Sequence, residues 1–335
     1  MRNRTAVVLT GGALVLLGVC LFALLYGSYE MPVGRILHTL LYGGTPSEHL
    51  AVWGIRVPRI LVAVFVGIAL SASGCVMQGI THNPLAEPGI IGINAGATLA
   101  VVLYISFRSA AYYSALGVGT LLFTPLVSIA GAFCAAALIY RLASRNGMIG
   151  KQRLVLVGVG INIAISAAIT MFQLAMSKGN YNQALTWTNG SLWGTGFLYL
   201  AMIAPPITVV FAWLLYKSRT LDVLSFGDEL ATGLGVEANR VRKRLLLLSV
   251  LLASAAVAAA GNIAFVGLIG PHIAQRLIGS IHRRKLPAAA LISAALVVLA
   301  DTLSRNLFSP IEIPVGITLS LIGVPYFIYL MLKER

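Results

Sequence analysis

The stretch GIALSASGCVMQGITHNPLAEPGIIGINAGATL, residues 67–99, determines the architecture of this chain. Small and apolar residues run without a charge up to Thr81 and resume after Gly89. Pro84 and Pro88 lock φ and lack a backbone N–H, so a helix must break between them. Because apolar segments flank the break on both sides, we interpret it as a turn at a membrane face between two spanning helices.

The composition extends this interpretation to the whole chain. Apolar residues make up 58% of the 335 residues and charged residues 10%, with a mean hydropathy of +0.89. Soluble domains carry about 25% charged residues. At roughly 20 apolar residues per spanning helix, the chain has room for about ten spans. The sequence therefore predicts an all-α polytopic membrane protein with one transmembrane domain over 1–335. Continuous rather than alternating apolar runs argue against a transmembrane β-barrel.

Ten apolar segments are long enough to be interpreted as spans, with a short amphipathic helix predicted at 33–42 after the first. Their predicted ranges are 5–27, 57–81, 89–107, 113–140, 153–176, 197–216, 245–260, a segment entered between Gly261 and Pro271 and ending near Gly279, 287–303 and 314–332.

The positions of lysine and arginine orient these spans. With the N-terminus inside, 18 of the 24 basic residues lie on the inside and 6 on the outside. We therefore predict that both termini are cytoplasmic. The net charge of +14 follows from this topology, so we expect no nucleic-acid partner. The outside residues are Arg35, Arg56, Arg59, Arg108, Lys178 and Arg305.

The sequence lacks the residue patterns of catalytic and metal sites. No lysine follows a GxxxxGK[ST] pattern, so the chain has no phosphate-cradling loop. The five histidines are dispersed, without metal-ligand spacing. No acidic pair lies inside a predicted span, as a proton relay would require. We predict no catalytic residue, no metal site and no cofactor bound by this chain.

The cytoplasmic segment LDVLSFGDELATGLGV, residues 221–236, is long and patterned for a loop between spans. It predicts two short helices with apolar faces, separated at Gly227. One interpretation is a solvated loop; the other is a docking element whose apolar face enters a partner's groove. Since this chain has no nucleotide site, the second interpretation favours docking to an ATPase. The candidate coupling residues are Leu221, Leu224, Gly227, Asp228, Glu229, Leu230, Leu234 and Gly235.

Arg56 and Arg59 flank Pro58 at the outer mouth of the second span, and Arg305 lies at the outer end of the ninth. Each could be an interfacial arginine that meets lipid headgroups. Exposed together on one face, they could instead receive carboxylates of an extracellular partner, because guanidinium pairs bidentately with carboxylate.

The fifth span carries four uncharged polar side chains, which makes it the best candidate for a pathway wall. Hydrogen bonding between helices is the alternative for each of them. The residues are Asn162, Ser166, Thr170 and Gln173. A small-residue helix, a polar break and a proline occur at 67–92 and again at 254–279, either as an internal repeat or by chance.

Four motifs in order make the chain resemble the permeases of the large ten-span (type II) ABC importers for iron–siderophores, haem and cobalamin. They are RVPRILVAVFVGIALSASGCVMQGITHNPLAEPGIIGINAGA (56–97), AGNIAFVGLIGPHIAQRLIG (260–279), HRRKLP…LADTLSR (282–305) and IEIPVGITLSLIGVPYFIYLM (311–331). Two local departures are Gln275, where the family commonly has arginine, and Ile281, where an acidic residue often precedes the histidine.

This resemblance implies a multi-pass permease of the cell membrane that pairs with a second permease subunit, the same or homologous. Two cytoplasmic ATPases, which would hold ATP and Mg²⁺, would dock on 221–236. A substrate-binding protein outside would place glutamates on Arg56, Arg59 and Arg305. The loop at 142–152 would contribute to the cytoplasmic gate.

The expected cargo is a ferric siderophore, with a hydroxamate as one guess and haem or cobalamin as alternatives within the family. A secondary transporter driven by an ion gradient is the rival class. It requires an essential membrane-embedded acid, for which Asp301 is the nearest candidate. An intramembrane enzyme would need a clustered His/Asp/Glu site, which the sequence does not have.

Overall fold

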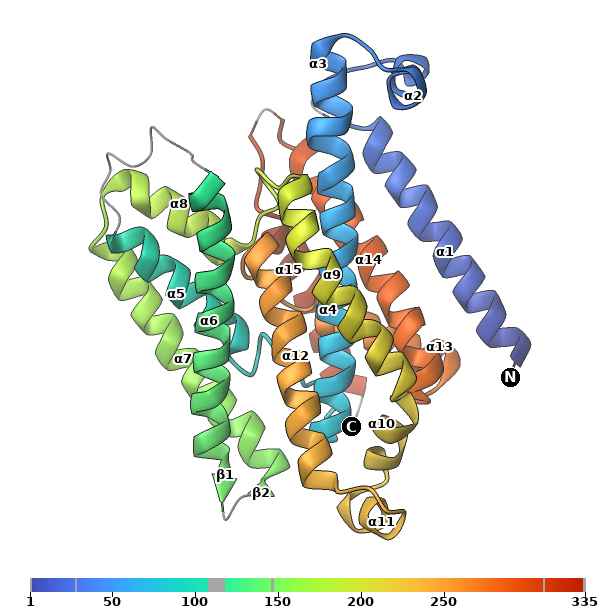
Figure 1. The fold of residues 1–335 in the computed structure, drawn as a ribbon, viewed down its shortest axis with the longest axis vertical. Helices are drawn as coiled ribbons and strands as arrows, with labels where there is room; N and C mark the ends of the chain where they lie inside the picture. The colour runs from blue at the N-terminus through green and yellow to red at the C-terminus, as the bar shows by residue number, and fades with distance from the viewer. Residues whose placement is uncertain (1, 28, 108–117, 146–147, 310, 334–335) are drawn as a thin grey trace.

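The computed structural model describes residues 2–27, 29–107, 118–145, 148–309 and 311–333. Arg108, the start of the predicted fourth span and residues 146–147 of the predicted gate loop lie outside these ranges. Within these ranges the regular secondary structure is helical, apart from one small hairpin (Figure 1).

The first half consists of α1 (Arg2–Leu25), α2 (Val33–Tyr42), α3 (Pro46–His49), the π-helical turn η1 (Leu50–Arg56), α4 (Val57–Thr81), α5 (Ile93–Phe107), α6 (Val118–Ala143) and α7 (Lys151–Leu174). Strands β1 (Ser144–Arg145) and β2 (Met148–Ile149) pair antiparallel between α6 and α7. The second half consists of α8 (Lys178–Asn189), α9 (Phe197–Tyr216), α10 (Ser218–Ser225), α11 (Asp228–Gly233), α12 (Ala238–Ala260), α13 (Val266–Ile278), α14 (His282–Asn306) and α15 (Val315–Lys333).

Every predicted span corresponds to a helix, so the all-helical polytopic fold is confirmed. Among the described residues, eight helices are long and apolar enough to cross a membrane. Helices α5 and α13, at 15 and 13 residues, are shorter than the roughly 20 residues that a full crossing needs. Each follows a non-helical segment, α5 after the proline turn and α13 after Gly261. Each helix therefore begins partway along the bundle.

Helix α4 is the centre of the bundle, between α12 and α14 in Figure 1. Its residues from Pro58 to Thr81 are almost all buried. Small residues allow this close packing: a Cβ at Gly67 would lie 2.6 Å from the Cα of Ala294, and one at Gly74 would overlap the carbonyl of Gly267. Glycine and alanine at helix contacts are how membrane helices approach without a hydrophobic driving force.

The two ends of the bundle carry different short elements. Helices α2 and α3 lie at one end, and α10, α11 and the β-hairpin lie at the other (Figure 1). The predicted amphipathic helix at 33–42 is confirmed as α2. The predicted second span, 57–81, coincides with α4, but the helical segment begins earlier than predicted, because Thr45 caps α3 and η1 joins α3 to α4. Helix α8, in the polar stretch after α7, was not predicted.

In the turn between α4 and α5, His82 and Pro84 are exposed and Asn83 and Leu85 are partly exposed, whereas the residues from Ala86 to Pro88 are buried. The expected turn at a membrane face is therefore wrong for its second half, which enters the interior. There it meets the break between α12 and α13: Glu87 accepts a hydrogen bond from the N–H of Phe265 at 3.1 Å, and Asn94 donates to the carbonyl of Ile263 at 3.1 Å. The two segments proposed as a repeat thus pack against each other.

Candidate functional site

The outer end of the bundle holds the three arginines proposed for docking. In α4, Pro58 occupies the first helical turn, where its missing N–H costs no hydrogen bond. The η1 turn before it places Arg56 toward the end of α1, where its guanidinium donates to the carbonyls of Leu24, at 2.8 Å, and Tyr29. Arg305, in the last turn of α14, donates to the carbonyl of Ala23 at 2.7 Å.

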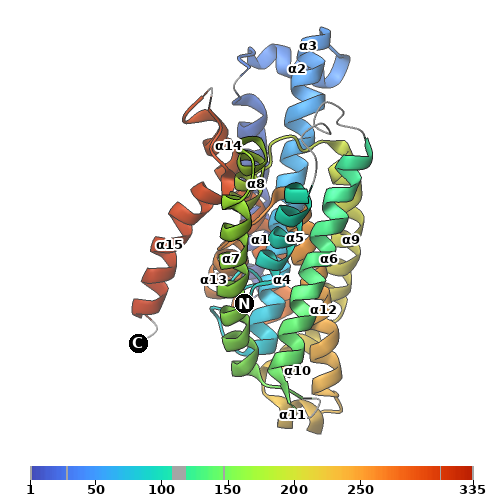
Figure 2. The ribbon, with the colours of Figure 1, turned by 90° about the vertical axis from the view of Figure 1, so that its left-hand side faces the viewer.

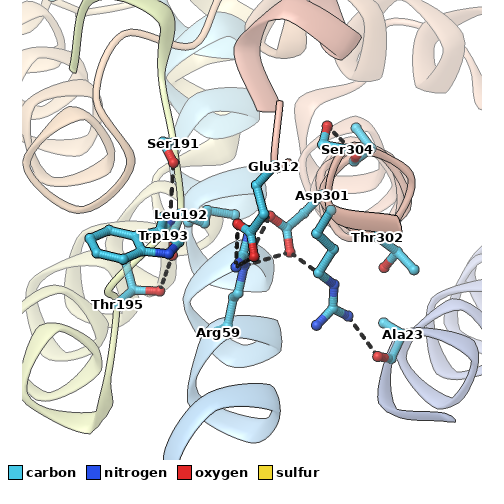
Figure 3. A network of polar contacts seen from close by, with 12 residues as sticks. Ala23, Arg59, Ser191, Leu192, Trp193, Thr195, Asp301, Thr302, Ser304 and Glu312 are labelled. Carbon is cyan, nitrogen blue, oxygen red and sulfur yellow. Dashed lines mark hydrogen bonds and ion pairs between the residues drawn. The ribbon is translucent and has the colours of Figure 1, made fainter. Parts of the chain in front are cut away.

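Arg59 lies between two carboxylates (Figure 3). Its Nε and Nη2 donate to Asp301 at distances of 2.9–3.1 Å, and its Nη1 donates to Glu312 at 3.0 Å. Asp301 also lies 3.9 Å from Nε of Arg305, one turn along α14. A buried bidentate pair of this kind holds both partners in a fixed geometry. The network joins α4, α14 and the connection to α15.

The three arginines are at most 6% exposed, so the expectation that they lie exposed on the outer face is wrong. The guanidinium groups donate hydrogen bonds to carbonyls and carboxylates of the same chain, which offset the free-energy cost of burying their charge. Asp301, the acid that a secondary transporter would need, is in the same way paired with arginine. The docking role of the three arginines stays a prediction.

A second feature is a cavity of about 310 Å³ beside α7. The structure brings all four predicted pathway residues together on its wall. They face residues of the α4–α5 turn and of the α12–α13 connection, and α8 contributes Thr188. The lining residues are Glu87, Gly89, Ile90, Ala95, Asn162, Ser166, Ile169, Thr170, Gln173, Thr188, Asn262, Ala264 and Phe265.

Hydrogen bonds fix part of this wall. Gln173 donates to the hydroxyl of Thr188 at 2.9 Å, and Thr170 donates to the carbonyl of Ser166 at 3.1 Å. Gly92, with φ of 94°, brings the turn against α7 so closely that a Cβ would lie 3.3 Å from Cβ of Asn162. Glu87 and Asn262 were not predicted as lining residues. Glu87 lies in the non-helical segment between α4 and α5, and Asn262 lies in the one between α12 and α13.

The third feature is the coupling segment 221–236 at the opposite end. The two predicted short helices are confirmed as α10 and α11, separated at Gly227 with φ of 104°. Leu230 and Leu234 are 61% and 67% exposed, and Phe226, which was not predicted, is exposed beside them. Leu221 and Leu224 are buried, so the expectation that they share the exposed apolar face is wrong.

The remaining predicted coupling residues surround this exposed patch. Gly235 continues the chain with φ of 80°, and Glu229 stands in the first turn of α11. Asp228 pairs with the buried Arg242 of α12 at 2.6 Å, which ties α11 to the bundle.

Helix α10 is joined to the central helices by polar contacts. The carboxylate of Asp222 accepts the backbone N–H of His282 at 2.8 Å and lies 2.7 Å from its ring Nδ1, at the start of α14. The ring of His82, at the end of α4, donates to the carbonyl of Leu224 at 2.8 Å. These contacts connect α10 directly to α4 and α14.

One of the two sequence departures, Gln275, contacts a buried lysine. Nζ of Lys285 donates to the side-chain oxygens of Gln78, at 3.0 Å, and Gln275, at 2.8 Å. Arginine at position 275 would place a second cation beside this ammonium. Within the described ranges, no group of three or more His, Cys, Asp or Glu side chains could hold a metal ion.

The comparisons with known proteins agree with this architecture. The profile of the FecCD transport family matches residues 14–333. The chain belongs to the FecCD transport family. It is 42% identical over 333 residues to the iron(3+)-hydroxamate import system permease protein FhuG of Bacillus subtilis (strain 168), covering 99% of this chain and 98% of the relative.

Two further relatives extend the range of cargoes and supply a fold. The hemin transport system permease protein HmuU of Yersinia pestis is 38% identical, over 95% of this chain and 94% of its own. A solved structure described as an inward-facing conformation of a metal-chelate type ABC transporter superposes with a TM-score of 0.82 at 29% identity, over 98% and 99% of the two chains. This FecCD chain is thus a multi-pass ABC importer permease of the cell membrane, a transporter rather than an enzyme.

Proposed function

We propose that this chain is the membrane-spanning subunit of an ATP-driven importer that carries a ferric siderophore of the hydroxamate kind. The full-length similarity to a hydroxamate permease supports this cargo. Haem is the second candidate, supported by the similarity to a hemin permease over nearly the same length. In the ten-crossing topology that we propose, both termini lie on the cytoplasmic side with α10 and α11, and the 18-to-6 excess of basic residues supports this orientation.

The exposed apolar patch on the coupling segment is the observation that carries the ATPase partnership. Phe226, Leu230 and Leu234 are large apolar residues, each more than half exposed, at one end of the bundle. Exposed apolar side chains of this size are more stable in an apolar groove of a partner protein than in contact with water. ATP and Mg²⁺ bind to that partner, and its movements reach α4 and α14 through α10.

A second permease completes the pathway. Only 17% of the apolar 18-residue stretch of α7, and 28% of that of α15, is buried within the chain. Helix α15 also leans away from the bundle (Figure 2). The cavity of about 310 Å³ then forms one side of a passage whose other side belongs to the paired subunit, the same chain or a homologous one.

Arg56, Arg59 and Arg305 receive the carboxylates of the substrate-binding protein by exchange of partners. Glu312, at 31% side-chain exposure, is the accessible partner of Arg59 and the one that an incoming carboxylate displaces. Arg56 lies behind Gly27, which lines an outer cavity of about 650 Å³; a Cβ at Gly27 would lie 2.9 Å from Nη2 of Arg56.

The test is uptake by proteoliposomes that contain this chain, its ATPase, the paired permease and the binding protein loaded with an iron-55 trihydroxamate. Uptake that needs ATP and persists with collapsed ion gradients is the expected result. Uptake that stops with the gradient while ATP is intact would instead indicate a secondary transporter. Nucleotide hydrolysis by the purified chain alone would contradict the assignment of ATP to the partner.

A further inference from the structure

The residues that line the cavity beside α7 include an acidic side chain but no basic one. Its wall is made of apolar groups, hydroxyls and amides together with one carboxylate, that of Glu87, and none of the lining residues is a lysine, arginine or histidine. The bundle does contain buried lysine and arginine side chains, but those of the described residues lie elsewhere: Arg56, Arg59 and Arg305 at the outer end, Arg242 beside Asp228, and Lys285 with its two glutamines.

Glu87 is held rigidly in this wall. The two prolines around it fix the turn, and its Oε1 accepts the N–H of Phe265 at 3.1 Å. The side chain is 2% exposed, and its hydrogen-bond partners are backbone N–H groups at the start of α13 rather than a cation. Backbone N–H groups at a helix N-terminus favour a negative charge without cancelling it.

Glu87 is buried in the wall of the cavity, and Gly89 lies against its carboxylate. Gly89 also lines the cavity, and a Cβ there would lie 3.3 Å from Oε1 of Glu87. Because Gly89 has no side chain, it adds no further atoms between this buried carboxylate and the cavity. We propose that Glu87 sets the charge preference of the passage, so that neutral and cationic ferric chelates pass more readily than anionic ones.

The chemistry of iron chelates makes this preference meaningful. Three singly charged hydroxamates cancel the charge of Fe(III), whereas three doubly charged catecholates leave a triply negative complex. A fixed carboxylate in a medium less polarisable than water repels the second kind and leaves the first unaffected. The inference rests on the proposed import of a chelate, and it names the class that this wall accepts.

The experiment uses one chelate core at three charges. Ferrioxamine B is cationic through its free amine, its N-acetyl derivative is neutral, and its N-succinyl derivative is anionic. Initial uptake of each, with iron-55, is measured in proteoliposomes that hold the complete importer, at saturating loaded binding protein. We expect the wild type to move the cationic form about five- to tenfold faster than the anionic form. The two forms differ by two unit charges, and one unit charge several ångströms from a carboxylate in a water-like medium changes a rate by about threefold.

Glu87→Gln keeps the size and one acceptor oxygen of the side chain but removes the charge, and it should bring the cationic-to-anionic ratio close to one. Glu87→Asp keeps the charge and should keep the preference. The control is Glu237→Gln, which removes one exposed carboxylate at the start of α12 and should leave the ratio unchanged. A ratio does not depend on the amount of folded importer, so a purely structural role of Glu87 would not move it.

Four results would overturn the proposal. Equal uptake of all three chelates by the wild type overturns it without any variant. An unchanged ratio in Glu87→Gln, or an equal change in Glu237→Gln, does so as well. Uptake of none of the three overturns the hydroxamate function together with this inference, whereas equal uptake overturns this inference alone.

Discussion

The outer arginine network and the coupling segment are the two places where the sequence suggests contact with other proteins, and the structure treats them in opposite ways. At the outer end, Arg56, Arg59 and Arg305 turn inward and find partners within the chain. At the other end, Leu230 and Leu234 point outward although they are apolar.

The difference shows how each side chain meets its own requirement. A guanidinium needs acceptors, and it can be buried wherever carboxylates and carbonyls converge. A leucine needs contact with apolar atoms, and on the short helix α11 the bundle covers only one face. The buried charges are therefore expected to contribute to the stability of this chain, whereas the exposed leucines are the residues that the proposed ATPase partner would cover.

The first prediction breaks the outer network. Asp301→Ala leaves Arg59 and Arg305 without their shared buried carboxylate, and it should destabilise the protein by about 3–5 kcal/mol. Thermal unfolding of the purified protein in detergent measures the loss. Glu237→Gln, at an exposed ion pair, should cost less than about 1 kcal/mol. An unaltered melting temperature in Asp301→Ala would contradict a structural role of the network.

The second prediction reverses the character of the coupling patch. Leu230→Glu combined with Leu234→Glu should reduce chelate-stimulated ATP hydrolysis of the assembled importer at least about tenfold, a loss of about 1.4 kcal/mol or more in coupling. The melting temperature should stay the same, because both side chains are exposed. Replacing both leucines with methionine keeps an apolar side chain of similar volume and should retain hydrolysis. Full coupling in the glutamate variant would rule out docking at this patch.

The third prediction separates docking from transmission. Asp222→Ala removes the carboxylate that joins α10 to the start of α14, while Leu230 and Leu234 stay in place. Because the patch is intact, the ATPase should still bind, but less chelate should move per ATP, by about threefold for roughly 0.7 kcal/mol of coupling. Uptake and hydrolysis measured on the same proteoliposomes give this quotient. A quotient equal to that of the wild type would mean that α10 acts on the bundle through other contacts.

The fourth prediction concerns exchange of partners at Arg59. Glu312→Ala removes the accessible internal competitor and keeps Asp301, so affinity for the substrate-binding protein should rise by about two- to threefold, or roughly half a kcal/mol. Surface-immobilised binding protein and detergent-solubilised importer allow this measurement. Glu30→Ala, in the outer cavity but away from this ion pair, is the matched control. Lower affinity in Glu312→Ala would place Glu312 itself in the docking surface.

Local sequence signals predicted the order of helices well. The proline pair predicted the break after Thr81, the amphipathic pattern predicted α2, and Gly227 predicted the division between α10 and α11. The four polar residues of α7 were predicted to share a wall because they recur on one helix, and they do line one cavity. These features depend on neighbours within a few turns, which a sequence displays directly.

Long-range pairings were beyond the same signals. Arg59 and Asp301 are 242 positions apart, and Glu87 and Phe265 are 178 apart. Nothing near Arg59 in the sequence indicates that a carboxylate on α14 will bury it, and nothing near Leu221 indicates that α4 will cover it.

The sequence by itself determined the membrane-spanning helical class, the positions of the breaks, the orientation bias and the family. Only the tertiary structure decided which charges are buried, which leucines remain exposed and that the two broken segments meet at Glu87. The physical reason is that hydropathy and backbone geometry are local properties, whereas burial and ion pairing depend on the close packing of helices that glycine contacts such as Gly74 against Gly267 allow.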